Sequence, residues 1–334
     1  MSKRILITGG GGPAAISIIK AIRDADVKIH VADMNPTAAG LFLVPEAQRL
    51  VVPAGRSPSF IFHLLQECKD REIDLLIPTV DCELIPVATH EAEFREVGTR
   101  VLSSPKLALE RVLDKWKLYE HCLDAIPLPR TEPLIDLRGF ESWEYPVIVK
   151  PREGSGSRGI RLVESYEDLV ALGSNPELIV QDFLPGEEYS VDVLLDSGGR
   201  AMAAVPRVRM ATDSGVSVAS RTVHDEELIG YACTVSEHLG VRHVVNVQFR
   251  RDRDGKPRLL EINPRCPGTL PLTVQAGINM PLLAIEEQFG ESIPEDLAFQ
   301  ELAVVRFLEE QYVEVKALDA MAAYTMPRPV LKAV

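Results

Sequence analysis

The chain has 334 residues, of which 46% are hydrophobic and 25% are charged. This composition is typical of a folded protein rather than a disordered or membrane-embedded one, and the length predicts two or three domains rather than one core. The formal net charge is −13, and the lysines and arginines are dispersed instead of forming a basic stripe. A nucleic-acid partner is therefore disfavoured.

The N-terminus and the cysteines indicate a reducing compartment. Residues 5–8 form an apolar run that is too short for the core of a signal peptide and is ended by glycines. No apolar stretch approaches the roughly 20 residues that span a bilayer. The cysteines are scattered without a C-x-x-C pair, at Cys68, Cys82, Cys122, Cys233 and Cys266. We expect a cytoplasmic protein with reduced thiols, no zinc site and no membrane partner.

The first third of the chain alternates between strand-like and helix-like patterns. A strand, a glycine turn and an apolar-periodic helix follow one another over residues 4–22. Further strand-like runs occur at residues 28–32, 49–52, 75–78 and 100–103. This alternation predicts a doubly wound, Rossmann-like α/β domain with a parallel sheet over residues 1–104.

The first glycine turn has two interpretations. Gly9-x-Gly11-x-x-Ala14 fits a dinucleotide fingerprint, and Asp33 lies about where a ribose-binding acid is found. Glycine turns also open helices in many α/β domains for geometric reasons alone. The alternative is thus a tight turn at a helix N-terminus that holds some other anion.

Two acidic residues follow the strand at residues 75–78. Asp81 and Glu83 are expected at the carboxyl edge of the sheet, where open α/β sheets bind ligands, and there they are candidates for contacting a substrate amine. The alternative is a helix N-cap at Asp81, with acids favoured in the first turn by the helix dipole.

The pattern changes after residue 104. A helix is predicted over residues 105–122, and a proline-punctuated linker leads from it to strands that are joined by glycine turns. These features predict an α+β domain over residues 105–310. The pattern gives no placement for the tail, residues 311–334.

A lysine and a glycine loop form the first candidate site in this second domain. The predicted strand at 146–151 carries Lys150, and the loop at 152–159 separates it from another strand. Such a loop aims backbone N–H groups at phosphate oxygens while the lysine supplies positive charge. It is not a P-loop, because Ile160 and Arg161 stand where Lys-Ser/Thr is required. The alternative is a mobile hairpin loop with a solvated lysine.

A strand, turn and strand at residues 179–193 form the second candidate site. Backbone groups of the connection are suited to reading an adenine edge, and the carboxylate of Glu188 is suited to accepting both ribose hydroxyls. An ordinary turn with exposed acids is the other interpretation.

The third candidate site lies on a predicted hairpin. Period-two alternation places Asn246 and Gln248 on one face of a strand, and Glu261 and Asn263 on one face of the next. If residues 254–255 form a two-residue turn, Gln248 faces Glu261. Such hard oxygen ligands suit Mg²⁺, which binds through one or two carboxylates plus substrate phosphates. The alternative is a solvated polar face.

Arginines accompany these sites. Arg265 continues the alternation of Glu261 and Asn263, where a guanidinium is suited to holding a transferring phosphoryl group. Arg207, Arg209 and Arg221 flank residues 213–215, which together suggest an anion-binding loop for a substrate carboxylate. Surface arginines on strands are the alternative.

At these residues the chain resembles the ATP-grasp superfamily, specifically the module of the carbamoyl phosphate synthetase large subunit and related single-module ligases. The likeness covers roughly residues 1–310. Its motifs occur in the family's order and spacing at residues 114–115, 145–151, 152–159, 186–189, 246–249 and 261–265. The resemblance implies a pre-ATP-grasp domain (residues 1–104) followed by an ATP-grasp domain (residues 105–310), and we expect a lid at about residues 130–183.

The resemblance also implies roles for individual residues. The implied phosphate contacts are Lys115, Lys150 and the loop residues Gly154, Ser155, Gly156, Ser157 and Gly159. The implied adenine and ribose contacts are Gln181, Asp182, Phe183 and Glu188. Gln248, Glu261 and Asn263 are implied to hold Mg²⁺ or Mn²⁺, and Arg265 and Lys150 are implied to act in catalysis.

The expected activity is ATP-dependent ligation of a small carboxylate or carbamate to an amine or another nucleophile. The substrate is activated as an acyl phosphate, and ADP and phosphate are released. A non-catalytic ATP-binding sensor or scaffold is the alternative, and a homodimer is compatible with the sequence. The sequence does not identify the carboxylate or the nucleophile.

Overall fold

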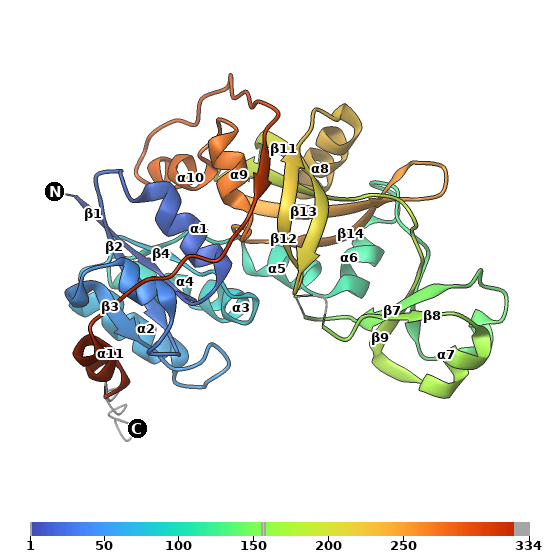
Figure 1. Cartoon of the computed structure of the whole chain (residues 1–334), viewed down its shortest axis with the longest axis horizontal. Coiled ribbons are helices and arrows are strands. Elements are labelled where there is room, and N and C mark those ends of the chain that lie inside the picture. Colours follow the sequence, from blue (N-terminus) through green and yellow to red (C-terminus); the bar gives the residue numbers. More distant parts are fainter. Residues whose placement is uncertain (1, 155, 157, 324–334) are drawn as a thin grey trace.

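The chain folds around three β-sheets that follow one another along its longest axis (Figure 1). The computed structural model describes residues 2–154, 156 and 158–323. The N-terminal sheet is parallel and has the order β3-β2-β1-β4-β5. Its strands are β1 (Lys3–Ile7), β2 (Val27–Asp33), β3 (Arg49–Val51), β4 (Leu75–Ile77) and β5 (Arg100–Val101).

Helices cover both faces of the N-terminal sheet because side chains alternate along each strand. Ile5 and Ile7 pack on the side of α1 (Pro13–Ile22), whereas Leu6 packs on the side of α2 (Phe60–Asp70). The remaining helical segments of this part are η1 (Ala39–Leu43), η2 (Glu46–Gln48), α3 (Asp81–Thr89) and α4 (Glu91–Glu96). The strand order reverses between β1 and β4, so the carboxyl ends of these two strands mark the expected ligand crevice.

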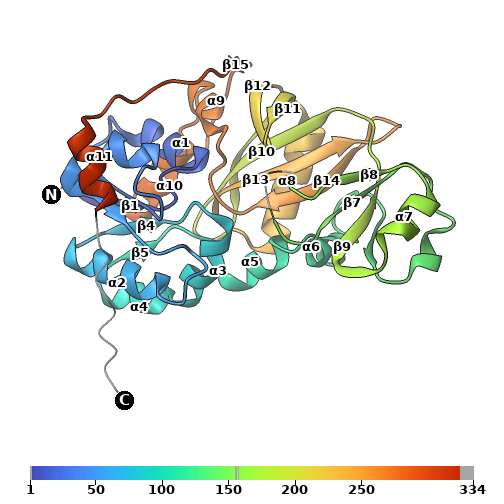
Figure 2. The ribbon, with the colours of Figure 1, turned by 60° about the horizontal axis from the view of Figure 1, so that its bottom comes forward.

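The helix predicted at residues 105–122 is two helices, and the single-helix prediction is wrong. α5 (Lys106–Val112) and α6 (Lys115–Cys122) meet at Asp114, whose carboxylate accepts the backbone N–H groups of Trp116 and Lys117. An aspartate in this conformation caps a new helix instead of continuing the old one. Figure 2 shows both helices between the N-terminal sheet and the sheet at the other end of the molecule.

A small four-stranded sheet lies at the end opposite the N-terminal sheet (Figure 1). Its order is β6-β9-β7-β8, with β6 (Thr131–Leu134), β7 (Val147–Pro151), β8 (Arg161–Val163) and β9 (Asn175–Asp182). The segment η3 (Leu137–Phe140) and α7 (Tyr166–Leu172) complete this part. Phe140, Trp143 and Leu169 belong to a hydrophobic cluster whose members all lie within residues 131–182. This part of the chain therefore has a core of its own.

The central sheet is antiparallel and six-stranded, with the order β14-β13-β10-β11-β12-β15. Its strands are β10 (Glu188–Leu195), β11 (Ala201–Asp213), β12 (Val216–Thr222), β13 (His243–Arg251), β14 (Pro257–Asn263) and β15 (Ala303–Val305). One face is apolar: Val191, Val247 and Phe249 pack with Leu228 of α8 (Glu226–Leu239). The opposite face carries polar residues such as Ser190, Asn246 and Gln248, and further along it Leu194 and Val244 pack with the N-terminal domain.

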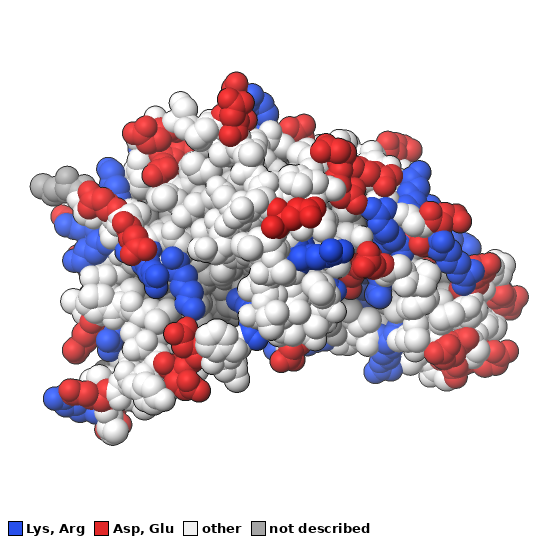
Figure 3. Space-filling model, turned by 45° about the horizontal axis from the view of Figure 1, so that its top comes forward, with Lys and Arg blue, Asp and Glu red and all other residues white. Residues whose placement is uncertain are grey.

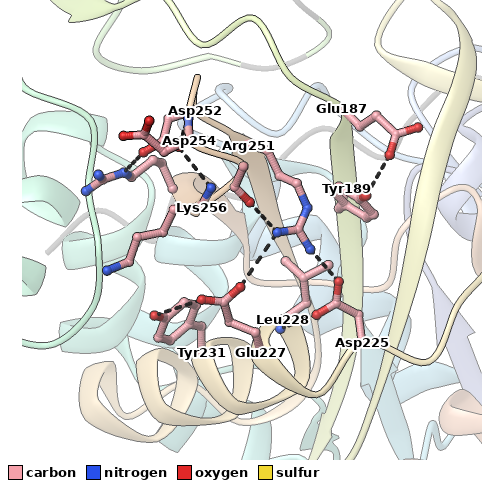
Figure 4. A network of polar contacts seen from close by, with 12 residues as sticks. Glu187, Tyr189, Asp225, Glu227, Leu228, Tyr231, Arg251, Asp252, Asp254 and Lys256 are labelled. Atoms are coloured by element: carbon pink, nitrogen blue, oxygen red, sulfur yellow. Dashed lines mark hydrogen bonds and ion pairs between the residues drawn. The ribbon is translucent and has the colours of Figure 1, made fainter.

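The β13–β14 hairpin has the predicted pairing but not the predicted turn. Gln248 pairs with Glu261, yet Phe249 pairs with Leu259, so a bulge lies between these two pairs. The connection is the longer loop of residues 252–256, in which Asp252 accepts the N–H groups of Asp254 and Lys256. Figure 4 shows this loop beside Arg251. The longer loop and the bulge offset each other, which restores the Gln248–Glu261 pair.

The C-terminal part returns to the N-terminal domain. α9 (Leu270–Gln275) and α10 (Met280–Gln288) pack beside α1, and Leu270 and Met280 join its hydrophobic cluster. After β15 the chain runs back over the N-terminal sheet to α11 (Val315–Ala322), where Met321 joins the same cluster (Figure 1). This contact places the first part of the tail, whose position the sequence pattern did not predict.

The apolar face of the central sheet predicts a stability difference between two phenylalanines. Phe249 is 0% exposed and Phe307 is 84% exposed. Phe249→Ala is expected to lower the free energy of unfolding by about 3–5 kcal/mol, because it leaves a cavity in the core. Phe307→Ala, the control, is expected to change it by less than about 0.5 kcal/mol. Urea unfolding measures both, and equal losses would contradict the assignment of this core.

Candidate active site

A cavity of about 710 Å³ lies where the three sheets approach one another. Its wall includes the carboxyl ends of β1 and β4, residues of β7 and β9 and the polar face of the central sheet. Most of the predicted site residues line it, namely Asp81, Glu83, Lys115, Lys150, Gly154, Gly156, Gln181, Asp182, Phe183, Glu188, Arg209, Gln248, Glu261, Asn263 and Arg265. Gly159, Arg207 and Arg221 do not, and Ser155 and Ser157 lie outside the described residues.

Strand register arranges the polar face of the central sheet in rows. Glu261, Gln248, Ser190 and Arg207 are successive partners across β14, β13, β10 and β11. Asn263, Asn246 and Asp192 form the next row. Because paired residues in an antiparallel sheet share a face, residues far apart in the sequence converge along one wall of the cavity.

The three predicted metal ligands are adjacent at the β14 end of these rows. The Asn263 Nδ2 group donates to Glu261 Oε1 at 3.3 Å, and Gln248 Nε2 donates to Asn246 Oδ1 at 3.5 Å. Within the described ranges, no group of three or more His, Cys, Asp or Glu side chains is placed to hold a metal ion. One carboxylate with two amide oxygens fits Mg²⁺, which takes its remaining ligands from water and substrate phosphates.

Lys115 links the glycine loop to this wall. Its Nζ donates to the carbonyl of Gly154 at 3.0 Å and lies 3.5 Å from Glu261 Oε2. The lysine is fixed because Asp114 both caps α6 and binds the Arg152 guanidinium, with a 2.6 Å bond to Nη2. The backbone N–H of Lys115 also donates to the carbonyl of Arg152 at 2.9 Å.

Glycines shape the loop that follows Lys150. Gly154, Gly156 and Gly159 have φ values of +126°, +71° and +77°, which favour residues without a Cβ atom. Gly156 lies against the β11–β12 connection, because a Cβ there would be 3.5 Å from the Ser214 carbonyl. The loop therefore reaches from the small sheet to the central sheet across the cavity.

Lys150 is buried in the cavity wall, with 6% of its surface exposed. Burial lowers the pKa of this ammonium to about 8, Lys115 lowers the pKa further, and Glu261 and Glu188 oppose the shift. A buried ammonium that lacks a close carboxylate is poorly compensated. An anionic ligand in the cavity would restore its ordinary pKa.

The predicted adenine and ribose residues lie at the junction of the small and central sheets. Gln181 donates to Thr131 Oγ1 at 2.9 Å, and Asp182 accepts the N–H of Arg130 at 3.1 Å. Burial raises the pKa of the Asp182 carboxyl group. The Glu188 carboxylate lies 2.7 Å from Arg209 Nε and 3.8 Å from Arg250 Nη1. Phe183 lines the same part of the wall.

Asp81 and Glu83 reach the cavity from the N-terminal domain. Neither oxygen of Asp81 caps α3, since the cap residue is Val80 without a side-chain bond; the N-cap interpretation is therefore wrong. Both oxygens instead accept hydrogen bonds from Arg265. Glu83 is 6% exposed and accepts the hydroxyl hydrogen of Thr8, and burial raises the pKa of its carboxyl group to about 7.

Arg207 and Arg221 do not form the predicted anion-binding loop. Arg207 is 0% exposed, and its Nε and Nη2 groups donate to Asp192 at 2.9 and 2.6 Å. Asp192 also accepts from Asn246 and Thr273, so Arg207 belongs to a buried network behind the wall. Arg221 is exposed on β12 and lies outside the cavity. Of these three arginines, Arg209 alone lines the cavity, where it pairs with Glu188.

The first glycine turn uses its own N–H groups. Gly10 donates to the Ala32 carbonyl at 3.0 Å, Gly11 to Asp33 Oδ2 at 2.7 Å and Gly12 to the Gly9 carbonyl at 2.8 Å. Asp33 thereby fastens the turn instead of facing a ribose. With these donors occupied, the geometry does not support dinucleotide binding at the turn.

Several polar side chains in the cavity wall were given no individual role from the sequence, among them Arg56, Arg158, Asn246 and Arg250. Arg56 follows β3 as Asp81 follows β4, so the same sheet-edge argument indicates it. Arg250 shares the parity of Asn246 and Gln248 along β13. Arg158 lies within the glycine loop that was already singled out.

Family models match both parts of the chain. One described as "ATP-grasp in the biosynthetic pathway with Ter operon" matches residues 174–311, and one described as "PylC-like, N-terminal domain" matches residues 5–102. The chain has the ATP-grasp fold. The resemblance to the ATP-grasp superfamily is thereby confirmed, as is the order of a doubly wound domain followed by an α+β ATP-grasp domain.

Solved ATP-grasp structures share this fold at low sequence identity. The biotin carboxylase domain of Hydrogenobacter thermophilus 2-oxoglutarate carboxylase is 17% identical, with a TM-score of 0.73 over 89% of this chain and 72% of that chain. N5-carboxyaminoimidazole ribonucleotide synthetase from Thermotoga maritima is 18% identical, with a TM-score of 0.69 over 92% of this chain and 82% of that chain. L-amino acid ligase from Bacillus licheniformis is 16% identical, with a TM-score of 0.64 over 86% of this chain and 74% of that chain.

The surface carries charges of both signs. On the face shown in Figure 3, acidic and basic side chains are interspersed and no broad basic stripe is present. Over residues 2–154, 156 and 158–323, no helix combines the length and apolar character needed to cross a bilayer.

Glu83 predicts a pH-dependent effect on stability. Burial raises the pKa of its carboxyl group from 4.5 to about 7, so the folded state binds more protons than the unfolded state between these values. Stability from this group is therefore present below pH 4.5 and is lost as the pH rises through 7. Glu83→Gln, which keeps the contact with Thr8, is expected to lose less stability than wild type between pH 5 and pH 8. Parallel curves from urea unfolding would contradict this.

Proposed function

We propose that this protein is an ATP-dependent ligase that forms ADP. It activates a small carboxylate or carbamate as an acyl phosphate and transfers the acyl group to an amine or another nucleophile. Phosphoryl transfer depends mainly on positioning and on neutralising charge. The cavity supplies both, because cations, a magnesium-type ligand set and a glycine loop line the same space.

The observation that carries the proposal is the arrangement of Glu261. Its carboxylate lies beside the amides of Asn263 and Gln248 on one side and 3.5 Å from Lys115 Nζ on the other. A triphosphate brought to this point meets a ligand set for its metal and cations for its remaining charge. Mg²⁺ held by Gln248, Glu261 and Asn263 would supply neutralisation of the phosphate oxygens.

The other wall residues are assigned by their places around this point. Lys150 and Lys115, together with the N–H groups near Gly154 and Gly156, bind phosphate oxygens. Gln181, Asp182 and Phe183 surround the adenine, and Glu188 accepts the ribose hydroxyls. Arg265, just after β14 ends at Asn263, contacts the γ-phosphoryl group and the acyl phosphate.

The names of similar proteins support the proposed class of substrates. The Hydrogenobacter thermophilus structure is described as a complex with MgADP, ADP and bicarbonate. A carboxyaminoimidazole ribonucleotide synthase from Aspergillus clavatus was solved with ATP, and an L-amino acid ligase is also among the similar structures. A carboxyl group or bicarbonate is common to the chemistry that these names describe.

The experiment that tests the proposal is a screen for ADP release. Purified protein is incubated with Mg-ATP and with amino acids and other carboxylates in pairs with amines. ADP that appears only when both substrates are present is expected. Tight ATP binding without substrate-dependent ADP release across the panel would favour the sensor or scaffold alternative.

Glu261→Gln provides the sharpest variant for the metal site. The amide keeps the shape of the side chain but removes the charge that holds Mg²⁺. Turnover is expected to be lost, while the fold and much of the ATP affinity are kept. Activity within a few-fold of wild type, measured as ADP release at saturating magnesium, would refute the metal assignment.

A further inference from the structure

An ion pair between Arg265 and Asp81 joins the central sheet to the N-terminal domain. Arg265 Nε donates to Asp81 Oδ1 at 2.6 Å, and Nη2 donates to Oδ2 at 3.2 Å. The side chains are 17% and 25% exposed, and both line the cavity. The contact therefore combines two-point geometry with partial burial, which separates it from an ordinary surface ion pair.

The pair leaves one edge of the guanidinium available. An arginine presents a side edge, formed by Nε and Nη2, and an end edge, formed by Nη1 and Nη2. Asp81 takes the side edge. Among the described residues, no hydrogen-bond acceptor is found for Nη1, and this atom is not among the buried atoms that lack a partner. The end edge thus remains open to a ligand in the cavity.

We infer that Asp81 is a positioning residue for Arg265, holding its side edge so that its end edge faces the γ-phosphoryl group during transfer. This inference rests on the proposed function. A free arginine side chain samples many rotamers, and a donor that is already oriented needs no reorganisation when charge develops in the transition state. Asp81 lies at the start of α3, directly after β4, so the N-terminal sheet itself fixes the carboxylate.

This role differs from the substrate-amine contact predicted from the sequence. Both oxygens of Asp81 already accept hydrogen bonds from Arg265. An amine that bound Asp81 directly would have to compete with a two-point contact. A positioning residue and an amine-binding residue also respond differently to substitution, since the first affects kcat and the second affects KM for the amine.

The test compares Asp81→Asn with a matched control, Asp225→Asn. Asp225 pairs with Arg251 (Figure 4), the two side chains are similarly exposed at 20% and 24%, and neither residue lines the cavity. Asparagine still caps α8 in the control. Asp81→Asn is expected to lower kcat for ADP release by about 10- to 100-fold, by analogy with the loss of side chains that orient metal ligands, with little change in KM for Mg-ATP. The control is expected to keep wild-type kcat.

A double-mutant cycle separates positioning from a merely structural role. If Asp81 acts through Arg265, then Asp81→Asn causes no further loss of kcat in the Arg265→Ala background. The inference would be overturned if the two substitutions lowered kcat independently, so that their losses multiplied in the double variant. An unchanged kcat in Asp81→Asn, or an effect confined to KM for the amine, would also overturn it. Melting temperatures check the fold. Asp81→Glu, which keeps the charge but moves the carboxylate, replaces Asp81→Asn if that variant does not fold, and the same loss is expected.

A binding measurement keeps the inference distinct from the proposed function. MgADP with beryllium fluoride mimics the γ-phosphoryl group without turnover. Asp81→Asn is expected to weaken binding of this complex by about 10-fold, because Arg265 is no longer held toward the γ-phosphoryl position, while leaving the affinity for MgADP unchanged. If the substrate screen fails but Asp81→Asn still binds MgADP with beryllium fluoride more weakly than wild type, the result counts against the ligase function and not against the positioning role. Equal affinities of wild type and Asp81→Asn for both probes would overturn the positioning role.

Discussion

The alternation of side chains along the central sheet is the constraint on which the site depends. One face is apolar and packs on α8, so the other face is free to carry polar groups. Antiparallel register then brings Glu261, Gln248 and Ser190 into one row although they lie on three strands. The cavity is built where the N-terminal and small sheets cover this polar face.

Burial of charge also shapes what this face can do. Asp192 and Arg207 are both 0% exposed and form a two-point ion pair, and Asn246 connects that pair to Gln248. Such a pair is expensive to desolvate, and removing one partner leaves an unpaired charge in the core. It therefore fixes the geometry of the wall from behind more than it adds net stability. Lys150 is the complementary case: it is buried, no carboxylate of the described residues forms an ion pair with it, and burial lowers its pKa to about 8.

Local patterns predicted the elements and the polar face, but not how the elements meet. Strand periodicity correctly paired Gln248 with Glu261, although through a two-residue turn that does not form. The bulge and the Asp252 loop depend on side-chain contacts that periodicity does not encode. Likewise, nothing local distinguishes Arg207 from Arg209: burial beside Asp192 follows from tertiary packing. The contact of Asp81 with Arg265 joins two domains, and sequence reasoning placed each residue at the cavity without linking them.

A crystal structure with Mg²⁺ and a non-hydrolysable ATP analogue tests the central claim most directly. The account predicts a metal ion about 2.0–2.1 Å from a Glu261 oxygen and from phosphate oxygens. It also predicts adenine beside Gln181, Asp182 and Phe183, and the γ-phosphate within reach of the free edge of Arg265. A nucleotide bound at the glycine turn of residues 9–12, or a metal ion that avoids Glu261, would contradict it.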